Sequence, residues 1–419
     1  MPVETAAAPS PTEAGSPLPA EEPVDPAAPP AEKGAEPEEP VAPAAPPAEK
    51  GAEPEEPVAP VAPPAEKGAE PEEPVDPVAP PAEKGAEPES VTPASYPTSG
   101  AIGVKYATAS AVLGAAISPE FTSQRFGGAY QLFENGTIAY LPQYGAYIVI
   151  GGNNSVWQSI GAQDSDLGYP ISAEYAPMTG GVMQIFQFGK ISWNPATGSR
   201  VTKGGIGGAW DNAGGPLGGL GYPTTDEYAP MPGGVMQDFQ YGKISWNAAT
   251  GSRVTKGGIG ATWDSAGGPL SGLGYPTTDE YATVNGGAVQ NFQYGQIAYS
   301  PATGSHIVRG AIGAMWILSG GPRGSFGYPT ADEITGLTGG GAKQYFQDAE
   351  IVWSPSVGTK RITGGIRSIW VAQGSEAGRL GYPISNAYWV SGGEGQDFQG
   401  GRITRYSGNT KIEYASDMQ

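Results

Sequence analysis

The feature that most constrains the fold is a phrase that returns along the chain every 53 or 54 residues. It reads Leu-Gly-Tyr-Pro, once with Phe in place of Leu, and its good copies begin at Leu167, Leu220, Leu273, Phe326 and Leu380. A degenerate copy begins at Leu113. A tryptophan precedes each good copy by ten residues, and a Gln-x-Phe-Gln phrase follows every copy in full or degenerate form. Six units of one design fill the region from residue 100 to 416, so the sequence predicts a tandem-repeat architecture.

The first 95 residues have a different composition from the repeats. They consist almost entirely of Pro, Ala, Glu, Val and Gly, with no aromatic residue before Tyr96. They hold 21 acidic residues against 4 lysines, whereas residues 96–419 hold 21 acidic against 18 basic residues, so most of the net charge of −20 lies in this tail. Such a segment cannot bury enough apolar surface to fold, and we expect a disordered, polyproline-like linker of up to about 290 Å. It would serve as a spacer or as an acidic interaction arm.

Within one unit, the pattern of side chains predicts a short helix and about three strands. In the third unit Ile206 and Trp210 lie four residues apart on one helical face, and the Gly-Gly-Pro at 214–216 ends the helix. Residues 234–246 alternate in the manner of two strands, and a hairpin turn surrounds Gly251. We expect this Trp, and the Phe of the Gln-x-Phe-Gln phrase, to belong to the core.

The predicted fold is therefore mainly β, with six tandem units of about 53 residues behind the tail. The predicted domains are the linker at 1–95 and the repeat domain at 96–419, with units near 100–151, 152–203, 204–256, 257–309, 310–363 and 364–416. A unit of this size cannot bury the faces of its own sheet, so neighbours must stack. We expect closure into a propeller-like ring, because an open array leaves a sheet edge free at each end. The period by itself is also compatible with an open array.

The repeated phrases resemble a known family. Leu-Gly-Tyr-Pro on a period near 54, preceded by GGIGGAW at 204–210 and followed by FQYGKISW at 239–246 and ATGSRV at 249–254, is similar to the LGFP repeats of actinobacterial cell-surface proteins, with Tyr in place of Phe. The resemblance covers roughly residues 100–415. It implies a non-catalytic array that holds a protein on the cell wall by contacting wall glycan. The esterase or amidase domain found beside such repeats is missing from this chain.

Catalytic chemistry has little support in the residues. The chain has no Cys and a single histidine, His306, so a thiol nucleophile, a Ser-His-Asp triad or a histidine-based metal site lacks its components. Adjacent acidic residues recur, but neighbours in sequence point apart, whereas a glycosidase needs two carboxylates that face each other. We weigh helix capping (Thr224 with Glu227), turn stabilisation, and glycan or cation contact as their roles. The pairs are Asp226 and Glu227, Asp279 and Glu280, and Asp332 and Glu333. We predict no enzyme, no cofactor and no metal site.

Two further kinds of side chain are candidates for ligand contact. The Tyr of each good copy stands between Gly and Pro, where it either joins the core or presents its ring to a ligand. The Gln side chains of the strand phrase either satisfy backbone groups between units or offer amides to sugar hydroxyls. Together with the acidic pairs, the candidate ligand-binding residues are Tyr169, Tyr222, Tyr275, Tyr328, Tyr382, Gln184, Gln237, Gln240, Gln290 and Gln293. Equivalent units carry equivalent surfaces, and several weak sites on one polymer give high avidity.

The sequence thus favours a module that binds cell-wall polysaccharide of the arabinogalactan or peptidoglycan type. A second expected partner is a catalytic or surface protein that is not part of this chain. A structural or adhesive protein that binds other proteins is the second interpretation, and a wall-polymer hydrolase is the third. No apolar run reaches the length of a membrane helix, and a near-neutral domain behind an acidic tail is a poor partner for nucleic acid. No signal peptide is visible, yet a long spacer before a repeat array favours a secreted, wall-associated protein.

Overall fold

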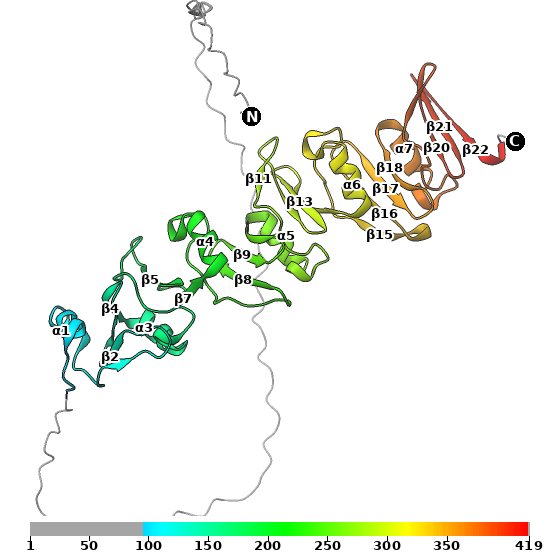
Figure 1. The fold of residues 1–419 in the computed structure, drawn as a ribbon. Coiled ribbons are helices and arrows are strands. Elements are labelled where there is room, and N and C mark those ends of the chain that lie inside the picture. Colours follow the sequence, from blue (N-terminus) through cyan, green and yellow to red (C-terminus); the bar gives the residue numbers. More distant parts are fainter. Residues whose placement is uncertain (1–94, 418–419) are drawn as a thin grey trace, which may run out of the picture. The chain divides into compact units, whose positions relative to one another are not determined.

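The computed structural model describes residues 95–417, so the predicted tail lies outside the described residues except for Ser95. The described residues form six antiparallel sheets of three or four strands, one sheet for each repeat (Figure 1). We number the units one to six in chain order and begin each unit with its helix. Within residues 95–417, no helix has both the length and the apolar composition needed to cross a membrane.

Each unit opens with a helix of eight or nine residues, and the first unit adds a single turn. The helices are α1 (Gly100–Ala107), α2 (Ser110–Leu113), α3 (Gly151–Ser159), α4 (Gly204–Asn212), α5 (Gly257–Ser265), α6 (Gly310–Leu318) and α7 (Gly364–Ala372). From the second unit on, a 3-10 turn follows, at Ala162–Asp164, Gly215–Leu217, Gly268–Leu270, Gly321–Arg323 and Ser375–Ala377. Further 3-10 turns lie at Thr338–Gly340 and Ala415–Asp417.

The strands of each unit pair with their neighbours in chain order. Units one and two contain β1 (Phe121–Thr122), β2 (Ala129–Phe133), β3 (Gly136–Leu141), β4 (Gly145–Ile150), β5 (Val182–Phe186), β6 (Gly189–Asn194) and β7 (Gly198–Lys203). Units three and four contain β8 (Gly234–Phe239), β9 (Gly242–Asn247), β10 (Gly251–Lys256), β11 (Tyr281–Ala282), β12 (Ala288–Phe292), β13 (Gly295–Ser300) and β14 (Gly304–Arg309). Units five and six contain β15 (Ile334–Leu337), β16 (Gly341–Tyr345), β17 (Glu350–Ser354), β18 (Gly358–Ile362), β19 (Tyr388–Val390), β20 (Gly393–Phe398), β21 (Gly401–Tyr406) and β22 (Asn409–Tyr414).

The predicted helix of the third unit is confirmed. Ile206 and Trp210 lie on the buried face of α4, and Gly214 follows its end with a φ of 94°, in the left-handed region that favours glycine. The Trp210 Nε1 donates a hydrogen bond of 3.0 Å to the carbonyl of Gly221 in the Leu-Gly-Tyr-Pro turn. The equivalent tryptophans are all fully buried, so the helix and the turn are joined through the core in every good copy.

The hydrophobic core is shared between consecutive units. In one cluster Met183 of the second unit packs with Trp210, Tyr222 and Phe239 of the third. Other clusters likewise combine strands of one unit with the helix and turn of the next. The stacking predicted from the size of the unit is therefore confirmed, because each unit completes its core against its neighbour.

A buried glutamine joins each unit to the one before it. The Gln237 Nε2 donates to the carbonyl of Val201 on β7 of the second unit at 2.8 Å and to the carbonyl of Thr225 in its own unit at 2.9 Å. The equivalent glutamines make the same pair of bonds, and their partners in the preceding unit are Ile148, Val254, Ile307 and Arg361. The last strand of each sheet in chain order is an edge strand, and the glutamine of the next unit binds one of its outward-facing carbonyls.

The segment before α1 takes the place of a preceding unit. Gln131 of the first unit donates to the carbonyl of Pro97 at 3.1 Å. Pro97 lies three residues before α1, as Val201 lies three residues before α4. The first unit therefore satisfies its glutamine with the chain that enters it.

Closure into a ring is not confirmed. None of the six sheets of residues 95–417 closes on itself or shares a strand with another. Between units one and six, the backbone hydrogen bonds of the described residues include none. In Figure 1 the elements of successive units follow one another from α1 to β22.

Candidate functional site

An open groove recurs beside the start of the helix. In units two, three and five its volume is about 310, 300 and 310 Å³. Its lining combines the first two residues of the helix, a glutamate from the turn after Leu-Gly-Tyr-Pro, and an aromatic residue of the middle hairpin strand. In the third unit these are Gly204, Gly205, Glu227 and Trp246. We call this feature the Glu-aromatic groove.

The aromatic ring of the groove lies directly against the helix start. A Cβ atom on Gly205 would lie 2.7 Å from Ser252 Oγ and 2.9 Å from Trp246 Cδ1, so a side chain here would push the ring aside. Trp246 is 37% exposed, although the two residues before it in β9, Ile244 and Ser245, are buried. Trp193 and Trp353 are half-buried at the equivalent positions. The ring is thus fixed on one side by the helix and leaves part of its surface open to the groove.

The glutamate of the groove is partly withdrawn from water. Burial raises the pKa of Glu227, and the charge and backbone of Lys203 oppose that shift. Burial also raises the pKa of Glu174, where the side chain of Asn153 donates to the carboxylate at 3.0 Å and opposes the shift. Keeping a carboxylate half-buried costs free energy, so a position that repeats one is a candidate for function.

The preceding unit completes the wall of the groove. In the third unit's groove Asp166, Phe188 and Lys203 come from the second unit. Phe188 is 51% exposed, and the equivalent Tyr241 and Tyr294 are 68% and 67% exposed. An aromatic surface with a few charged groups around it is the usual composition of a small-ligand site.

The glutamate and the aromatic residue occur together or not at all. Strand register defines the equivalent positions, because one isoleucine in each unit pairs with the last strand of its sheet: Ile138, Ile191, Ile244, Ile297, Ile351 and Ile403. The aromatic residue stands two places after each, and the first five units carry Glu120 with Tyr140, Glu174 with Trp193, Glu227 with Trp246, Glu280 with Tyr299, and Glu333 with Trp353. The sixth unit has Ala387 and Arg405 instead. Arg405 forms an ion pair with Glu394 in its own sheet. Within this chain the two side chains are therefore present together in five units and absent together in the sixth.

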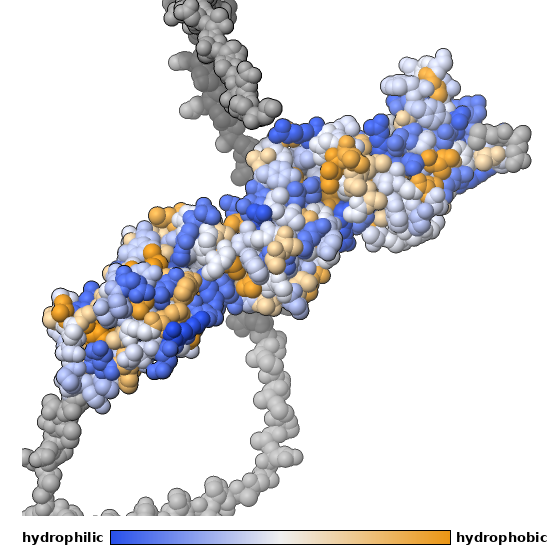
Figure 2. Space-filling model, viewed as in Figure 1, coloured by the Kyte–Doolittle hydropathy of each residue, from blue (hydrophilic) through white to orange (hydrophobic). Residues whose placement is uncertain are grey.

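A larger cavity adjoins the groove of the third unit. It has a volume of about 560 Å³ and shares Asp166, Lys203, Glu227 and Val235 with that groove. Its apolar wall contains Val156, Ile160, Leu167 and Val201. Groove and cavity together form a continuous hollow at the junction of units two and three. On the face shown in Figure 2, apolar residues lie in separate small patches among polar ones.

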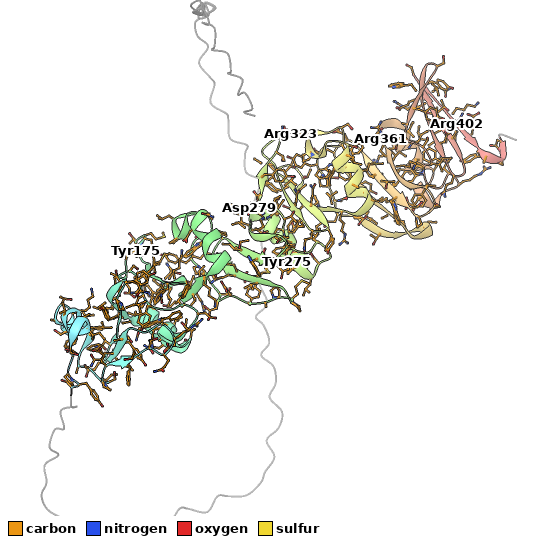
Figure 3. All side chains as sticks on the ribbon, viewed as in Figure 1. Tyr175, Tyr275, Asp279, Arg323, Arg361 and Arg402 are labelled. Carbon is orange, nitrogen blue, oxygen red and sulfur yellow. The ribbon has the colours of Figure 1, made fainter. Side chains whose placement is uncertain are left out.

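The aspartate of each acidic pair contacts the preceding unit. Asp279 Oδ1 accepts the N–H of Val254 at 2.8 Å, and Asp332 Oδ1 accepts that of Ile307 at 3.1 Å. These edge residues are the ones whose carbonyls the glutamines bind. Figure 3 labels Tyr275 and Asp279, both of the fourth unit. At the junction of units two and three, Asp226 instead pairs with Arg200 at 3.3 Å.

The recurring positions match a family model. The model of the LGFP repeat aligns with residues 113–165, 167–218, 220–271, 273–324 and 326–378, which together make up more than half of the chain. The chain belongs to the LGFP repeat family. From the second match on, each LGFP repeat begins at the Leu or Phe that opens the phrase. The mainly β, tandem-repeat fold predicted from the sequence is therefore confirmed.

Other comparisons add little to the LGFP assignment. A search of curated proteins finds no match. Among solved structures, the extracellular domain of the one-component system BT4673 from B. thetaiotaomicron has 10% identity and a TM-score of 0.13, and the alignment covers 71% of this chain and 35% of that one. The hemopexin fold protein CP4 from cow pea has 10% identity and a TM-score of 0.13, with 43% and 85% covered. At such scores neither structure bears on the fold or the function of the LGFP units.

The tyrosines of the LGFP phrase are not ligand contacts, and this part of the prediction is wrong. The five side chains are buried, with exposures from 0% to 3%. Tyr169 Oη donates to the carbonyl of Gly127 at 2.7 Å, and Tyr382 Oη donates to that of Thr338 at 2.9 Å, in each case in the preceding unit. Burial raises the pKa of Tyr169 to about 12. The corrected set, which belongs to the core between units, is Tyr169, Tyr222, Tyr275, Tyr328 and Tyr382.

The glutamine candidates are also corrected. Gln184, Gln237 and Gln290 are fully buried, and each amide donates to two carbonyls, so the interpretation in which they satisfy backbone groups is confirmed. The Oε1 atoms of Gln240 and Gln293 accept the N–H groups of the phrase tyrosines at 2.9 and 2.8 Å. Both halves of the Gln-x-Phe-Gln phrase therefore hold the fold rather than a ligand.

The acidic pairs divide into two roles. The capping prediction for Thr224 and Glu227 is wrong, because no helix begins at that turn. The aspartates face the preceding unit, whereas Glu227 and Glu333 line grooves. Glu280 is exposed at the equivalent position. Sequence reasoning missed the partners of these glutamates. The available signal was the aromatic residue that recurs in the strand before the last of each sheet, at Trp193, Trp246, Tyr299 and Trp353.

Proposed function

We propose that this LGFP module is non-catalytic and binds cell-wall polysaccharide through several weak sites, one at each Glu-aromatic groove. In this way it would anchor a protein to the bacterial envelope as a secreted, wall-associated chain. The observation that carries the proposal is the joint occurrence of glutamate and aromatic ring in five units and their joint loss in the sixth.

The chemistry of the groove suits a sugar. A sugar ring has an apolar face that can lie on a half-exposed aromatic ring such as Trp246, and its hydroxyls can donate to a carboxylate such as that of Glu227. A groove of about 300 Å³ has room for little more than a small ligand. Each site would be weak, and several of them on one polymer would bind it with high avidity.

The number of carboxylates argues against hydrolysis. Glu174 is the single acidic residue that lines the groove of the second unit, and Glu333 is the single one in that of the fifth. Glycoside hydrolysis needs two carboxyl groups that flank the bond. The feature common to the grooves is therefore one carboxylate and one ring, and the groove of the third unit adds Asp166 and Lys203 from the second unit.

The test is retention of the full chain on isolated cell-wall material, before and after the attached polysaccharide is stripped from the peptidoglycan. The variant replaces together the three groove rings and the equivalent ring of the fourth unit: Trp193→Ala, Trp246→Ala, Trp353→Ala and Tyr299→Ala. We expect the wild type to be retained and the fourfold variant to lose retention by more than tenfold, since avidity multiplies across sites. Stripping shows which wall layer holds the ligand.

The matched control is Trp389→Ala, which removes an 86% exposed tryptophan that lines none of the grooves described above. It should leave retention unchanged, and thermal unfolding should show that both variants remain folded. Full retention of the folded fourfold variant would refute the grooves as sites. Wild-type protein that does not bind wall glycan at all would refute the function and favour an adhesive role toward other proteins.

A further inference from the structure

The junction of units two and three differs from the next two junctions in the side chains that bind the backbone of its edge strand. At the edge residues Val254 and Ile307, an aspartate of the next unit accepts the backbone N–H while a glutamine binds the carbonyl. At Arg361 an asparagine does the same, since Asn386 Oδ1 accepts its N–H at 3.1 Å. The junction of units two and three keeps the glutamine bond to Val201 but lacks the acidic one.

The missing bond follows from a different side-chain pairing. Asp226 turns toward Arg200, with 3.3 Å between Oδ2 and the guanidinium, rather than toward the N–H of Val201. Within residues 95–417 we find no acceptor bonded to that N–H. Because Val201 pairs with Ile191 as Val254 pairs with Ile244, its N–H points outward from the sheet as that of Val254 does.

Val201, whose N–H points outward from the sheet, is one of the residues that line the 560 Å³ cavity. Its lining also includes the apolar side chains of Val156 in α3 and of Ile160, the residue after α3. The charged lining residues include Asp226 and Glu227 together with Arg200 and Lys203. An apolar wall, a backbone donor and a carboxylate acceptor thus meet in one hollow that continues into the Glu-aromatic groove.

Resting on the proposed glycan-binding function, we infer that this junction recognises an N-acetylated amino sugar. The acetamido carbonyl would accept the Val201 N–H in place of the aspartate used at the next two junctions. The methyl group would pack on Val156 and Ile160, and the acetamido N–H would donate to Asp226 or Glu227. The sugar ring would continue over Trp246 in the adjoining groove.

The lining favours this group over a plain hydroxyl. A hydroxyl alone leaves the apolar side chains of the cavity without a contact, whereas a methyl group packs on them. A site built around a hydrogen-bond donor also rejects analogues that lack the acceptor, since the buried donor then stays unpaired. The acetamido group satisfies the donor, the wall and the acceptor together.

The test compares two trisaccharides with one backbone, triacetylchitotriose and cellotriose, titrated into the isotope-labelled full chain. We expect the acetylated probe to bind at least tenfold more tightly and to shift the Val201 amide resonance. Ser159→Trp, at the cavity mouth on α3, should weaken binding at least tenfold. Its matched control is Asn212→Trp, at the last position of α4 as Ser159 is the last of α3, and this variant should bind as the wild type does.

Two further variants test the vacant donor. Arg200→Ala frees Asp226 to accept the Val201 N–H, as Asp279 accepts that of Val254, and should weaken the acetylated probe at least tenfold. Asp226→Ala should retain binding, because Glu227 can still accept the acetamido N–H. Equal affinity for both trisaccharides, an unmoved Val201 resonance, or equal losses in Ser159→Trp and Asn212→Trp would each overturn the inference.

The outcomes also separate this inference from the function on which it rests. Full chain that is retained on cell wall but does not distinguish the trisaccharides overturns the inference and keeps the proposed function. Full chain that binds the acetylated probe at this junction but is not retained on the wall supports the inference and overturns wall anchoring. In Ser159→Trp, wall retention through the other grooves should persist while trisaccharide binding is lost.

Discussion

The buried glutamine between units gives the sharpest test of the fold. Gln237 is fully buried, and its amide donates to the carbonyls of Val201 and Thr225 at 2.8 and 2.9 Å. Gln237→Ala removes both donors and leaves two carbonyls without these partners. Leaving one buried polar group unsatisfied costs about 1–3 kcal/mol, so we expect a loss of about 2–5 kcal/mol in the free energy of unfolding. Against a typical domain stability of about 5–15 kcal/mol this is a large fraction.

The loss should fall on the junction of units two and three. In a repeat protein each unit is stabilised by its neighbours, so a weakened interface should divide the single unfolding transition into two. Urea unfolding followed by fluorescence of the buried tryptophans gives the free energy, and calorimetry shows the division. Gln240→Ala is the matched control, because that half-buried side chain makes one bond, to the N–H of Tyr222. Gln240→Ala should lower the free energy of unfolding by about half as much as Gln237→Ala does.

A pH series sharpens the same test. In Gln237→Glu the new carboxylate faces two carbonyls and cannot donate, so its folded pKa lies above that of an unfolded glutamate, about 4.3. The protonated form still donates one bond, and this contribution is lost as the pH rises through the folded pKa. The variant should therefore be less impaired at pH 4 than at pH 7. A loss below about 1 kcal/mol in Gln237→Ala, or an equal loss in the control, would refute the reasoning.

Three further predictions concern single positions. Burial raises the pKa of Glu227, so the charged carboxylate destabilises the fold once the pH rises above the pKa of the unfolded state. Glu227→Gln should therefore raise the melting temperature at pH 7 and leave it unchanged near pH 3. It should also weaken glycan binding. A Cβ on Gly181 would lie 1.9 Å from Tyr222 Oη, so Gly181→Ala should cost at least about 1–3 kcal/mol in urea unfolding, whereas Gly208→Ala, which meets nothing within 4 Å on α4, should be neutral or gain up to about 1 kcal/mol. His306→Arg restores the residue of two earlier units and should change stability by less than about 0.5 kcal/mol, measured by the same urea titration.

Much of the fold could be predicted from the sequence because it depends on local spacing. The four-residue interval between Ile206 and Trp210, the alternation in residues 234–246 and the glycines around the turns define a helix and a hairpin within one unit. The exact period then requires that every unit repeats them. The stacking of units followed from their small size, since one unit cannot bury its own sheet.

The role of each recurring side chain could not be predicted in the same way. A residue recurs either because every unit packs identically or because every unit presents the same site, and the sequence pattern is the same in both cases. Tyr222 is buried since its hydroxyl end reaches Gly181 of the preceding unit, where a side chain would not fit. Trp210 is fully buried and Trp246 is 37% exposed, although both are tryptophans that recur on the same period.

The contacts between units decided between these two cases, and they join residues that are far apart in the sequence. Val201 and Asp226 are 25 residues apart, and only the packed junction shows that an aspartate binds the edge N–H in one place and leaves it free in another. The sequence by itself determined the repeat, its elements and its family. The tertiary structure decided which face of each unit packs against its neighbour and which face remains open to a ligand. The reason is that the burial of a side chain depends on the shape of the adjoining unit and not on the repeated sequence motif itself.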